Sequence, residues 1–323
     1  MLFEEQISRK PNLYPWTTDF INAMWVGHWT PNEFNFQSDV QDFKTKLSKE
    51  EREIITKSLS AIAQIEIAVK KFWAKVGDNL PHPSINDLGS VMASVEVIHN
   101  IAYEKLLISL GLEGVFDENL KLDIIQGRVN YLRKYLHKYY KDSKKQYVYS
   151  LILFTLYVEN VSLFSQFYII NWFNRYRNIL KDTSQQIAYT AKEETIHALA
   201  GIKIINTLRE EYPELFDEDL EKIVLHETKE AFEAESKIID WIIGDYNEKD
   251  LNSEILKEFI KFRLNDSIGQ IGFKKVFEVD EKMIAQTKWF DEDILGNCMT
   301  DFFWKKPTEY AKKSQVINEN SIF

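Results

Sequence analysis

The chain has 323 residues, of which 28% are charged and 45% are hydrophobic, and its formal net charge is -10. This composition is that of a soluble protein, and the acidic balance argues against nucleic acid as a partner because phosphate binding needs a basic face. The single cysteine, Cys298, excludes disulfides within the chain and a thiolate metal site. The first residues lack the basic and apolar pattern of a signal peptide, so we expect a cytoplasmic protein.

Helix breakers are few and unevenly placed. The chain contains 11 glycines and 7 prolines, and most prolines lie near the two ends or in one loop. Proline is absent from four long stretches, which are residues 91–110, 119–141, 147–180 and 183–209. This pattern predicts an all-α protein built from long helices.

The N-terminal residues 1–37 are rich in aromatic side chains, and we expect a loop-like arm that packs on the body of the protein. Helical periodicity begins at Ser48, which has the spacing of a capping box with Glu51. This predicted helix carries Glu66 inside an apolar run and ends before a proline-containing loop at 77–86.

The second long helix is predicted over residues 86–110. It carries Glu96, His99 and Tyr103 on a mostly apolar background. Gly111 follows it directly and is well suited to a left-handed cap, because glycine adopts positive φ without steric cost.

Two different helices are expected in the middle of the chain. Residues 118–142 have the pattern of an amphipathic surface helix whose basic side chains face solvent. Residues 147–173 are apolar enough to suggest a membrane span, but polar side chains such as Glu159 and Asn160 interrupt them. No comparable second span follows, so we interpret this stretch as the buried central helix of a bundle in a protein that contacts no membrane. If this stretch did span a membrane, the protein would need detergent to stay in solution, so a preparation without detergent would exclude that alternative.

Three more helices and a tail complete the chain. Helices are predicted over 183–209, 218–244 and 251–273, and the first carries Glu193, Glu194 and His197. Residues 301–323 begin with an aromatic segment that ends at Pro307 and continue as a polar tail that cannot bury much apolar surface. We therefore expect residues 301–323 to be flexible after one domain formed by residues 1–300.

Acidic and imidazole side chains recur inside the apolar helices. Because each helical residue advances by about 100°, Glu96, His99 and Tyr103 fall within about 60° of one another, and Glu194 shares a face with His197. A lone Glu-x-x-His pair is more often a surface contact than a metal site. Four buried carboxylates converging in one bundle, however, would be untenable without cations to compensate their charge.

Two metal ions would provide that compensation. Bundles with a dimetal site take one Glu from each of two helices and Glu-x-x-His from each of two others. The candidate ligands in this chain are Glu66, Glu96, His99, Glu159, Glu194 and His197. Hard oxygen donors with two nitrogens suit iron or manganese. We expect iron first, with manganese or a mixed pair as alternatives that use the same donors.

At these residues the chain resembles the small, radical-generating subunit of class I ribonucleotide reductase, over nearly its whole length. The resemblance implies a ferritin-like helical bundle with the dimetal site in its four-helix core. It also implies that Tyr103, four residues after the first ligand histidine, carries a tyrosyl radical. Glu66 stands where the family usually has Asp.

Further positions carry the same resemblance. Trp29 lies in a Trp-x-Pro sequence like the family's electron-relaying tryptophan, and Glu193 takes the place of the acidic residue that links this tryptophan to the ligand histidine. Tyr310, the only tyrosine after residue 300, matches the tyrosine that relays the radical between subunits. The radical pocket maps onto Leu163, where the family usually has Phe, and onto Phe167 and Thr190.

The resemblance therefore implies a ribonucleoside-diphosphate reductase subunit. It would pass a radical to a large subunit that reduces ribonucleotides to deoxyribonucleotides for DNA replication. The implied partners are that large subunit, docked by the last residues, and a second copy of the chain; a flavodoxin-like activator is a further source of oxidant. No glycine-rich loop for nucleotide phosphates is present.

Two other functions remain open for the same helical pattern. A dimetal oxidase or desaturase acting on a small or lipid substrate would share all six ligands, but Tyr103 and the tail with Tyr310 argue against it. A ferritin-like iron store would normally be a much shorter chain without an arm or tail.

Overall fold

The protein is all-α. The computed structural model describes residues 1–296, except for the side chains of residues 66–69. Within this range the only β-type pairing is an isolated bridge between Glu248 and Leu251. The elements in chain order are α1 (Thr17–Val26), η1 (Pro31–Glu33), α2 (Gln37–Thr45), α3 (Lys49–Ala74), α4 (Val76–Asn79), α5 (Pro83–Leu110), α6 (Glu113–Asn119), α7 (Asp123–Leu132), η2 (Arg133–Leu136), α8 (Ser143–Leu153), η3 (Phe154–Glu159), α9 (Phe164–Arg177), α10 (Lys181–Glu211), η4 (Pro213–Leu215), α11 (Glu218–Ile243), α12 (Ser253–Gln270), α13 (Glu281–Phe290) and η5 (Asp291–Leu295).

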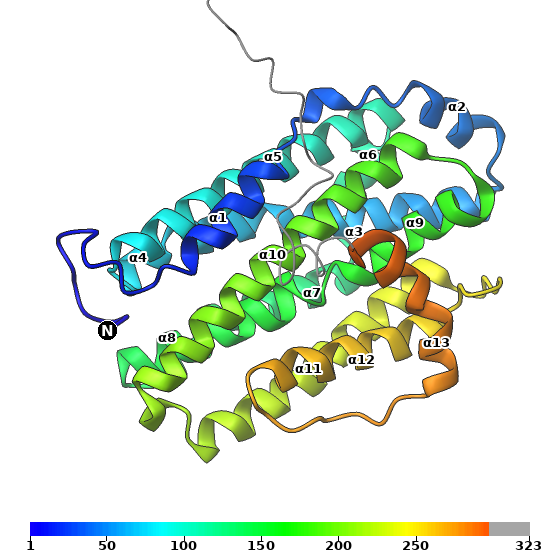
Figure 1. The fold of residues 1–323 in the computed structure, drawn as a ribbon. Helices are drawn as coiled ribbons and strands as arrows, with labels where there is room; N and C mark the ends of the chain where they lie inside the picture. The colour runs from blue at the N-terminus through cyan, green and yellow to red at the C-terminus, as the bar shows by residue number, and fades with distance from the viewer. Residues whose placement is uncertain (297–323) are drawn as a thin grey trace, which may run out of the picture.

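The long helices pack side by side as a bundle (Figure 1). α3 lies along α5, and α10 packs on α9, α8 and η3, so these elements enclose a common core. α1 covers α5 and α10 on one side. α11 and α12 pair on the opposite side of the bundle, and α13 packs on α12. This arrangement confirms the predicted all-α, ferritin-like bundle.

Local sequence signals place the ends of the two principal helices. Ser48 Oγ accepts a hydrogen bond from the amide of Glu51 at 3.1 Å, and the Glu51 carboxylate accepts one from the amide of Ser48 at 2.8 Å. This is the predicted capping box, and it satisfies two backbone donors at the start of α3. Gly111 ends α5 at φ 71°, as expected for a left-handed cap.

A glycine lets α10 approach the segment that carries Glu159. A Cβ atom on Gly201 would lie 2.4 Å from the hydroxyl oxygen of Thr155, which belongs to η3. No real Cβ contact is that short, so the absence of a side chain at residue 201 permits this spacing. Gly201 lies one turn beyond His197 on the same face, and the close approach brings the two polar segments together.

The apolar stretch in the middle of the chain is not one helix. α8 continues into the π-helical η3, which ends at Glu159, and α9 begins only after the turn at 160–163. By length and composition this segment is the one described region able to cross a membrane, but 89% of its most apolar window is buried inside the protein. The predicted buried position is therefore confirmed, whereas the predicted continuous helix is wrong.

Other boundaries also differ from the sequence-based expectation. The arm 1–37 is not loop-like throughout, because it contains α1 and η1. The predicted helix over 118–142 is broken into the end of α6, α7 and η2. α13 has no counterpart in the prediction. In each case short segments gain their order from packing on the bundle, and helix formation over ten residues or fewer depends on that packing more than on local propensity.

Arg128 is a buried cation in the segment 118–142, whose basic side chains were predicted to face solvent. It lies on α7 and is buried, with its Nε 2.9 Å from an oxygen of Glu235 on α11. It also donates to the carbonyl oxygens of Ala61 and Ser162 and to Gln166 Oε1. The positive charge of Arg128 is paired with Glu235, and its other donors bind the acceptors named above. It therefore does not compensate the negative charge of the carboxylates near Glu159.

Candidate metal centre

Three elements bring five polar side chains into the core. α5 contributes Glu96 and His99, α10 contributes Glu194 and His197, and the last residue of η3 contributes Glu159. The i, i+3 spacing puts each Glu and His on the inner face of its helix. All five side chains are buried.

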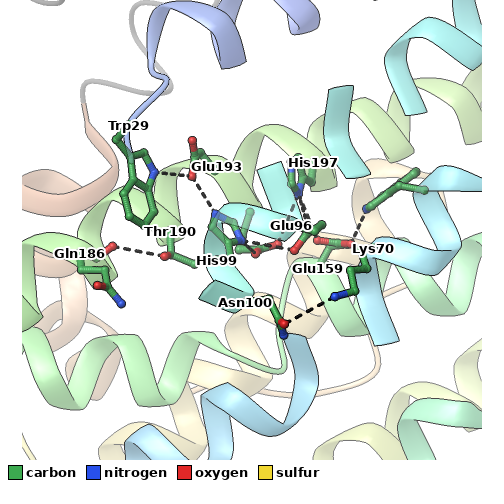
Figure 2. A network of polar contacts seen from close by, with 12 residues as sticks. Trp29, Lys70, Glu96, His99, Asn100, Glu159, Gln186, Thr190, Glu193 and His197 are labelled. Atoms are coloured by element: carbon green, nitrogen blue, oxygen red, sulfur yellow. Dashed lines mark hydrogen bonds and ion pairs between the residues drawn. The ribbon is translucent and has the colours of Figure 1, made fainter. Parts of the chain in front are cut away.

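The two histidines face each other across the carboxylates (Figure 2). His99 Nδ1 lies 3.3 Å from Glu96 Oε2 and 3.1 Å from Glu194 Oε1. His197 Nδ1 lies 2.7 Å from Glu96 Oε1, 3.6 Å from Glu194 Oε2 and 3.7 Å from Glu159 Oε2. Glu96 and Glu194 thus each direct one oxygen at His99 and the other at His197, so each carboxylate would be able to hold an ion beside either histidine.

The donor atoms fit a metal site better than a hydrogen-bonded cluster. One ligand atom each from Glu96, Glu159, Glu194 and His197 lies within 4.8 Å of the others. Despite these short distances, both oxygens of Glu96 and of Glu194, and Nδ1 of His197, have no partner with hydrogen-bond geometry among the described residues. Buried polar atoms are rarely left so, and donors directed at a shared point suit bound cations.

Charge in the cluster is strongly coupled. Burial alone lowers the pKa of His99 and His197, but the surrounding carboxylates outweigh it and raise both pKa values well above the ordinary value. Burial and the neighbouring Glu194 raise the pKa of Glu159. Burial opposes ionisation of Glu194 as well, yet the neighbouring Glu159 and the two histidines lower its pKa. Without metal the cluster retains protons that metal ions would replace.

Glu193 joins the centre to the N-terminal segment. Its Oε2 accepts a hydrogen bond from Trp29 Nε1 at 2.8 Å and lies 2.7 Å from His99 Nε2 (Figure 2). With a metal ion bound, this carboxylate would hold the proton of His99 on Nε2 and leave the lone pair of Nδ1 for the ion, on the side of Glu96 and Glu194. The indole of Trp29 also stacks on the His99 ring, with centroids 6.2 Å apart.

Trp73 contacts the candidate metal centre, and this contact was not predicted from the sequence. This buried tryptophan of α3 donates its Nε1 hydrogen to Glu159 Oε1 at 2.6 Å, and its ring lies 6.4 Å from that of His197. It follows Glu66 by seven residues, and this two-turn spacing was the available signal that it shares a helix face with a predicted ligand.

Of the other site residues predicted from the sequence, some are buried in the core and the rest lie outside the described part of the structure. Tyr103 lies one turn after His99 and is buried, as are Leu163, Phe167 and Thr190. The hydroxyl of Thr190 donates to the carbonyl oxygen of Gln186 one turn earlier. The side chain of Glu66, the relay candidate Tyr310, Cys298 and the tail 301–323 lie outside the described residues.

A helical bundle that buries carboxylates and histidines at this spacing defines the class of dimetal-carboxylate proteins. Within that class the chain belongs to the family described as ribonucleotide reductase, small chain, whose model matches residues 6–283. The predicted resemblance is thus confirmed.

Named relatives cover most of this chain. It is 25% identical over 307 residues to the ribonucleoside-diphosphate reductase subunit beta of Halalkalibacterium halodurans, covering 93% of this chain and 87% of the relative. It is 24% identical to a probable small subunit from Invertebrate iridescent virus 3, covering 97% and 86%. The fold matches the ribonucleotide reductase R2 subunit from Clostridium botulinum with a TM-score of 0.76 and 19% identity, covering 85% of this chain and 88% of that one.

Proposed function

We propose that this chain is the radical-generating subunit of a ribonucleoside-diphosphate reductase. In this proposal Tyr103 is oxidised by the oxidising power that a bound dimetal centre would supply, and the oxidising equivalent passes to a large subunit that reduces ribonucleotides to deoxyribonucleotides. The observation that carries it is the shared oxygen of Glu193, which contacts both Trp29 and His99. A metal site with a purely structural role does not require a hydrogen-bonded link from a histidine to a tryptophan indole.

The proposed ligands are Glu66, Glu96, His99, Glu159, Glu194 and His197. When bound, two redox-active ions would supply the oxidising power by reducing oxygen or a reduced oxygen species. Iron is the first expectation, and manganese or a mixed pair would use the same donors. Burial of the centre excludes water, which limits the loss of oxidising equivalents to solvent.

The chain's own residues then hold and move the electron and proton. Tyr103 loses one electron and its phenolic proton and becomes a neutral radical. Leu163, Phe167 and Thr190 are buried and would offer it an environment with few groups to quench it. Trp29, Glu193 and His99 form the hydrogen-bonded path along which the equivalent leaves, and Tyr310 continues that path toward the large subunit.

The partners follow from the same proposal. Residues 1–300 would form the radical-generating domain, and residues 301–323 would dock on the large subunit in the cytoplasm. A second copy of the chain would cover the outer face of α5, where Val97, Ile101 and Ile108 are exposed. A flavodoxin-like activator would supply a reduced oxygen species if manganese occupies the site.

The test is an electron paramagnetic resonance spectrum after metal loading and oxygen exposure. We expect a tyrosyl signal that disappears in Tyr103→Phe. Tyr131→Phe removes another buried phenol, on α7, and should keep the signal. A protein that binds and oxidises iron, manganese or both, but never shows a tyrosyl signal, would contradict the proposal and favour a dimetal oxidase.

A further inference from the structure

Trp29 lies on a connecting segment and not on one of the helices of the bundle. Residues 27–36 join α1 to α2, and the short turn η1 is the one helical element within them. Thr30, which follows Trp29 directly, has an extended backbone with φ -129° and ψ 151°. The place of the Trp29 indole therefore depends on contacts from other elements, because connecting segments lack the regular backbone hydrogen bonds that fix a helix.

Lys105 binds this segment to α5. Its Nζ donates one hydrogen bond to the carbonyl oxygen of Pro31 at 2.7 Å and another to that of Phe34 at 2.8 Å. Pro31 is the first residue of η1 and Phe34 follows its last, so one ammonium group holds the whole turn. A lysine ammonium has three hydrogens, and two of them bind this one segment. Hydrogen bonds from a charged donor are also stronger than those between neutral groups.

The same helix carries a partner of the Trp29 indole. His99 lies six residues before Lys105 on α5, which is about 9 Å along the helix axis. The indole stacks on His99, and its Nε1 donates to Glu193, which also meets His99 (Figure 2). His99 and Lys105 thus contact two ends of one short segment from a single rigid element. A shift of η1 along α5 would move the indole relative to both of its partners.

The other contacts of the segment do not replace this one. Phe34 is buried, and its ring centroid lies 5.7 Å from that of Trp29, but apolar contacts have no preferred direction. Asp182 on α10 accepts a hydrogen bond from the amide of Phe36 at 3.0 Å, which fixes the far end of the segment. The hydrogen bonds from Lys105 begin only two residues after Trp29, so they control the backbone next to the indole.

We propose that Lys105 is a positioning residue, which holds the Trp29 indole against Glu193 by fixing the backbone around η1 to α5. Its importance for radical transfer rests on the proposed function, in which the oxidising equivalent leaves the centre through this contact. Loss of the ammonium group would loosen the contact without removing Tyr103 or any candidate ligand. Neither the family match nor the names of the relatives assign a role to Lys105.

The positioning role can be tested on the full-length, metal-free chain by nuclear magnetic resonance. The indole N–H signal of Trp29 is identified by its loss in Trp29→Phe. Its rate of hydrogen exchange with solvent reports how often the contact with Glu193 opens. Lys105→Met keeps the apolar stem of the side chain but removes both hydrogen bonds to the segment.

We expect exchange of the Trp29 indole hydrogen to become about tenfold faster or more in Lys105→Met, because two hydrogen bonds from a charged donor are lost. Lys105→Arg keeps a charged donor at this position and should restore most of the protection. The indole of Trp172 is the internal reference, since it donates to the carbonyl oxygen of Lys249 and should exchange at the same rate in all variants.

Lys57→Met is the matched control. Lys57 is also a half-buried lysine that donates to a backbone carbonyl, that of Trp241 at 2.9 Å, but this contact joins α3 to α11. We expect wild-type exchange of the Trp29 indole in this variant. Three results would overturn the positioning role: unchanged exchange in Lys105→Met, equal acceleration at Trp172 or in Lys57→Met, and exchange in Lys105→Arg as fast as in Lys105→Met.

The consequence for radical transfer is tested on the metal-loaded protein together with its large subunit. We expect Lys105→Met to form the Tyr103 radical to within about twofold of the wild-type yield, but to lower deoxyribonucleotide formation roughly tenfold or more, since small displacements of reacting groups slow transfer steeply. Wild-type turnover in Lys105→Met, or an equal loss of radical and turnover, would reject Lys105 as the residue that positions the outward path. Absence of any Tyr103 radical in the wild type would instead be a failure of the proposed function, and the exchange result would still decide whether Lys105 positions Trp29.

Discussion

At the scale of single residues, Glu159 shows how the centre is held from outside. Its Oε1 accepts the indole hydrogen of Trp73, and its Oε2 faces His197. The two oxygens therefore have different roles. The hydrogen bond from Trp73 holds one of them in place, and the other is available to bind a cation. Partners behind metal ligands commonly govern both the orientation of the ligand and the affinity of the site.

Replacing Trp73 tests this division of tasks. Trp73→Phe keeps an aromatic ring but removes the hydrogen bond to Glu159, and we expect metal affinity to fall by about 10- to 100-fold. Competition with a chromophoric chelator measures the change. Trp172→Phe is the control, because that indole donates to the carbonyl oxygen of Lys249 far along the chain from any candidate ligand. Wild-type affinity in Trp73→Phe would show that Glu159 is positioned by its backbone alone.

The sequence predicts part of this site for a definite reason. Glu96 with His99, and Glu194 with His197, share a helix face because helical geometry is local and regular. The meeting of Trp29 with Glu193, expected only from the family resemblance, joins residues 164 positions apart. The contact of Trp73 with Glu159 depends on how α3 packs against η3, and no residue spacing within one helix encodes it.

At the scale of elements, the start of α3 combines a cap with a tertiary contact. Glu51 completes the capping box with Ser48, forms an ion pair with Arg177 at the end of α9 and accepts a hydrogen bond from Tyr246 at 3.3 Å. Burial alone raises the pKa of Glu51, but the Ser48 amide and Arg177 outweigh it, and the net result is a lowered pKa. The cap thus ties the helix that carries Glu66 to the neighbouring α9.

This cap gives the protein a defined pH dependence. Because the pKa of Glu51 is lower in the folded state than in the unfolded state, its ionised form stabilises the fold above about pH 4.3. That contribution is lost as pH falls through the lower, folded-state pKa. We expect Glu51→Gln to reduce the free energy of unfolding at neutral pH by about 1 kcal/mol.

Urea denaturation of the metal-free protein at several pH values measures this change. The difference between wild type and Glu51→Gln should shrink as the solution is acidified, whereas exposed Glu50→Gln should differ little from wild type throughout. A difference that grows toward acid would contradict the assigned direction of the pKa shift.

Helix boundaries were predictable only where local chemistry sets them. Ser48 and Gly111 mark ends correctly, because capping depends on a few neighbouring residues. The sequence did not predict the π-helical η3, because this segment packs against distant residues. One of them is Gly201 of α10, which lies against Thr155 of η3. π-helical turns of this kind are frequent at functional sites, and here the irregular segment ends on the carboxylate of Glu159.

At the scale of the whole molecule, α5 has two faces with different purposes. Its inner face carries Glu96, His99 and Tyr103 into the core. Its outer face leaves Val97, Ile101 and Ile108 between 44% and 51% exposed. These positions follow helical spacing and form an apolar stripe, which also carries the exposed Glu104 between Ile101 and Ile108. Exposed apolar side chains grouped in this way are typical of a surface that another protein covers. The same helix would then support both the metal centre and the contact with a second copy.

The proposed dimer can be tested by placing a charge on that stripe. In Ile101→Glu an unpaired carboxylate would enter the interface, and since such burial costs several kcal/mol, we expect the dimer dissociation constant to rise about 100-fold or more. Sedimentation velocity over a range of concentrations measures this. Leu136→Glu is the matched control, because Leu136 is 62% exposed on η2, outside the stripe, and its substitution should leave the dimer intact. A wild-type chain that sediments as a monomer, or an Ile101→Glu dimer of unchanged affinity, would show that the outer face of α5 is not where two copies meet.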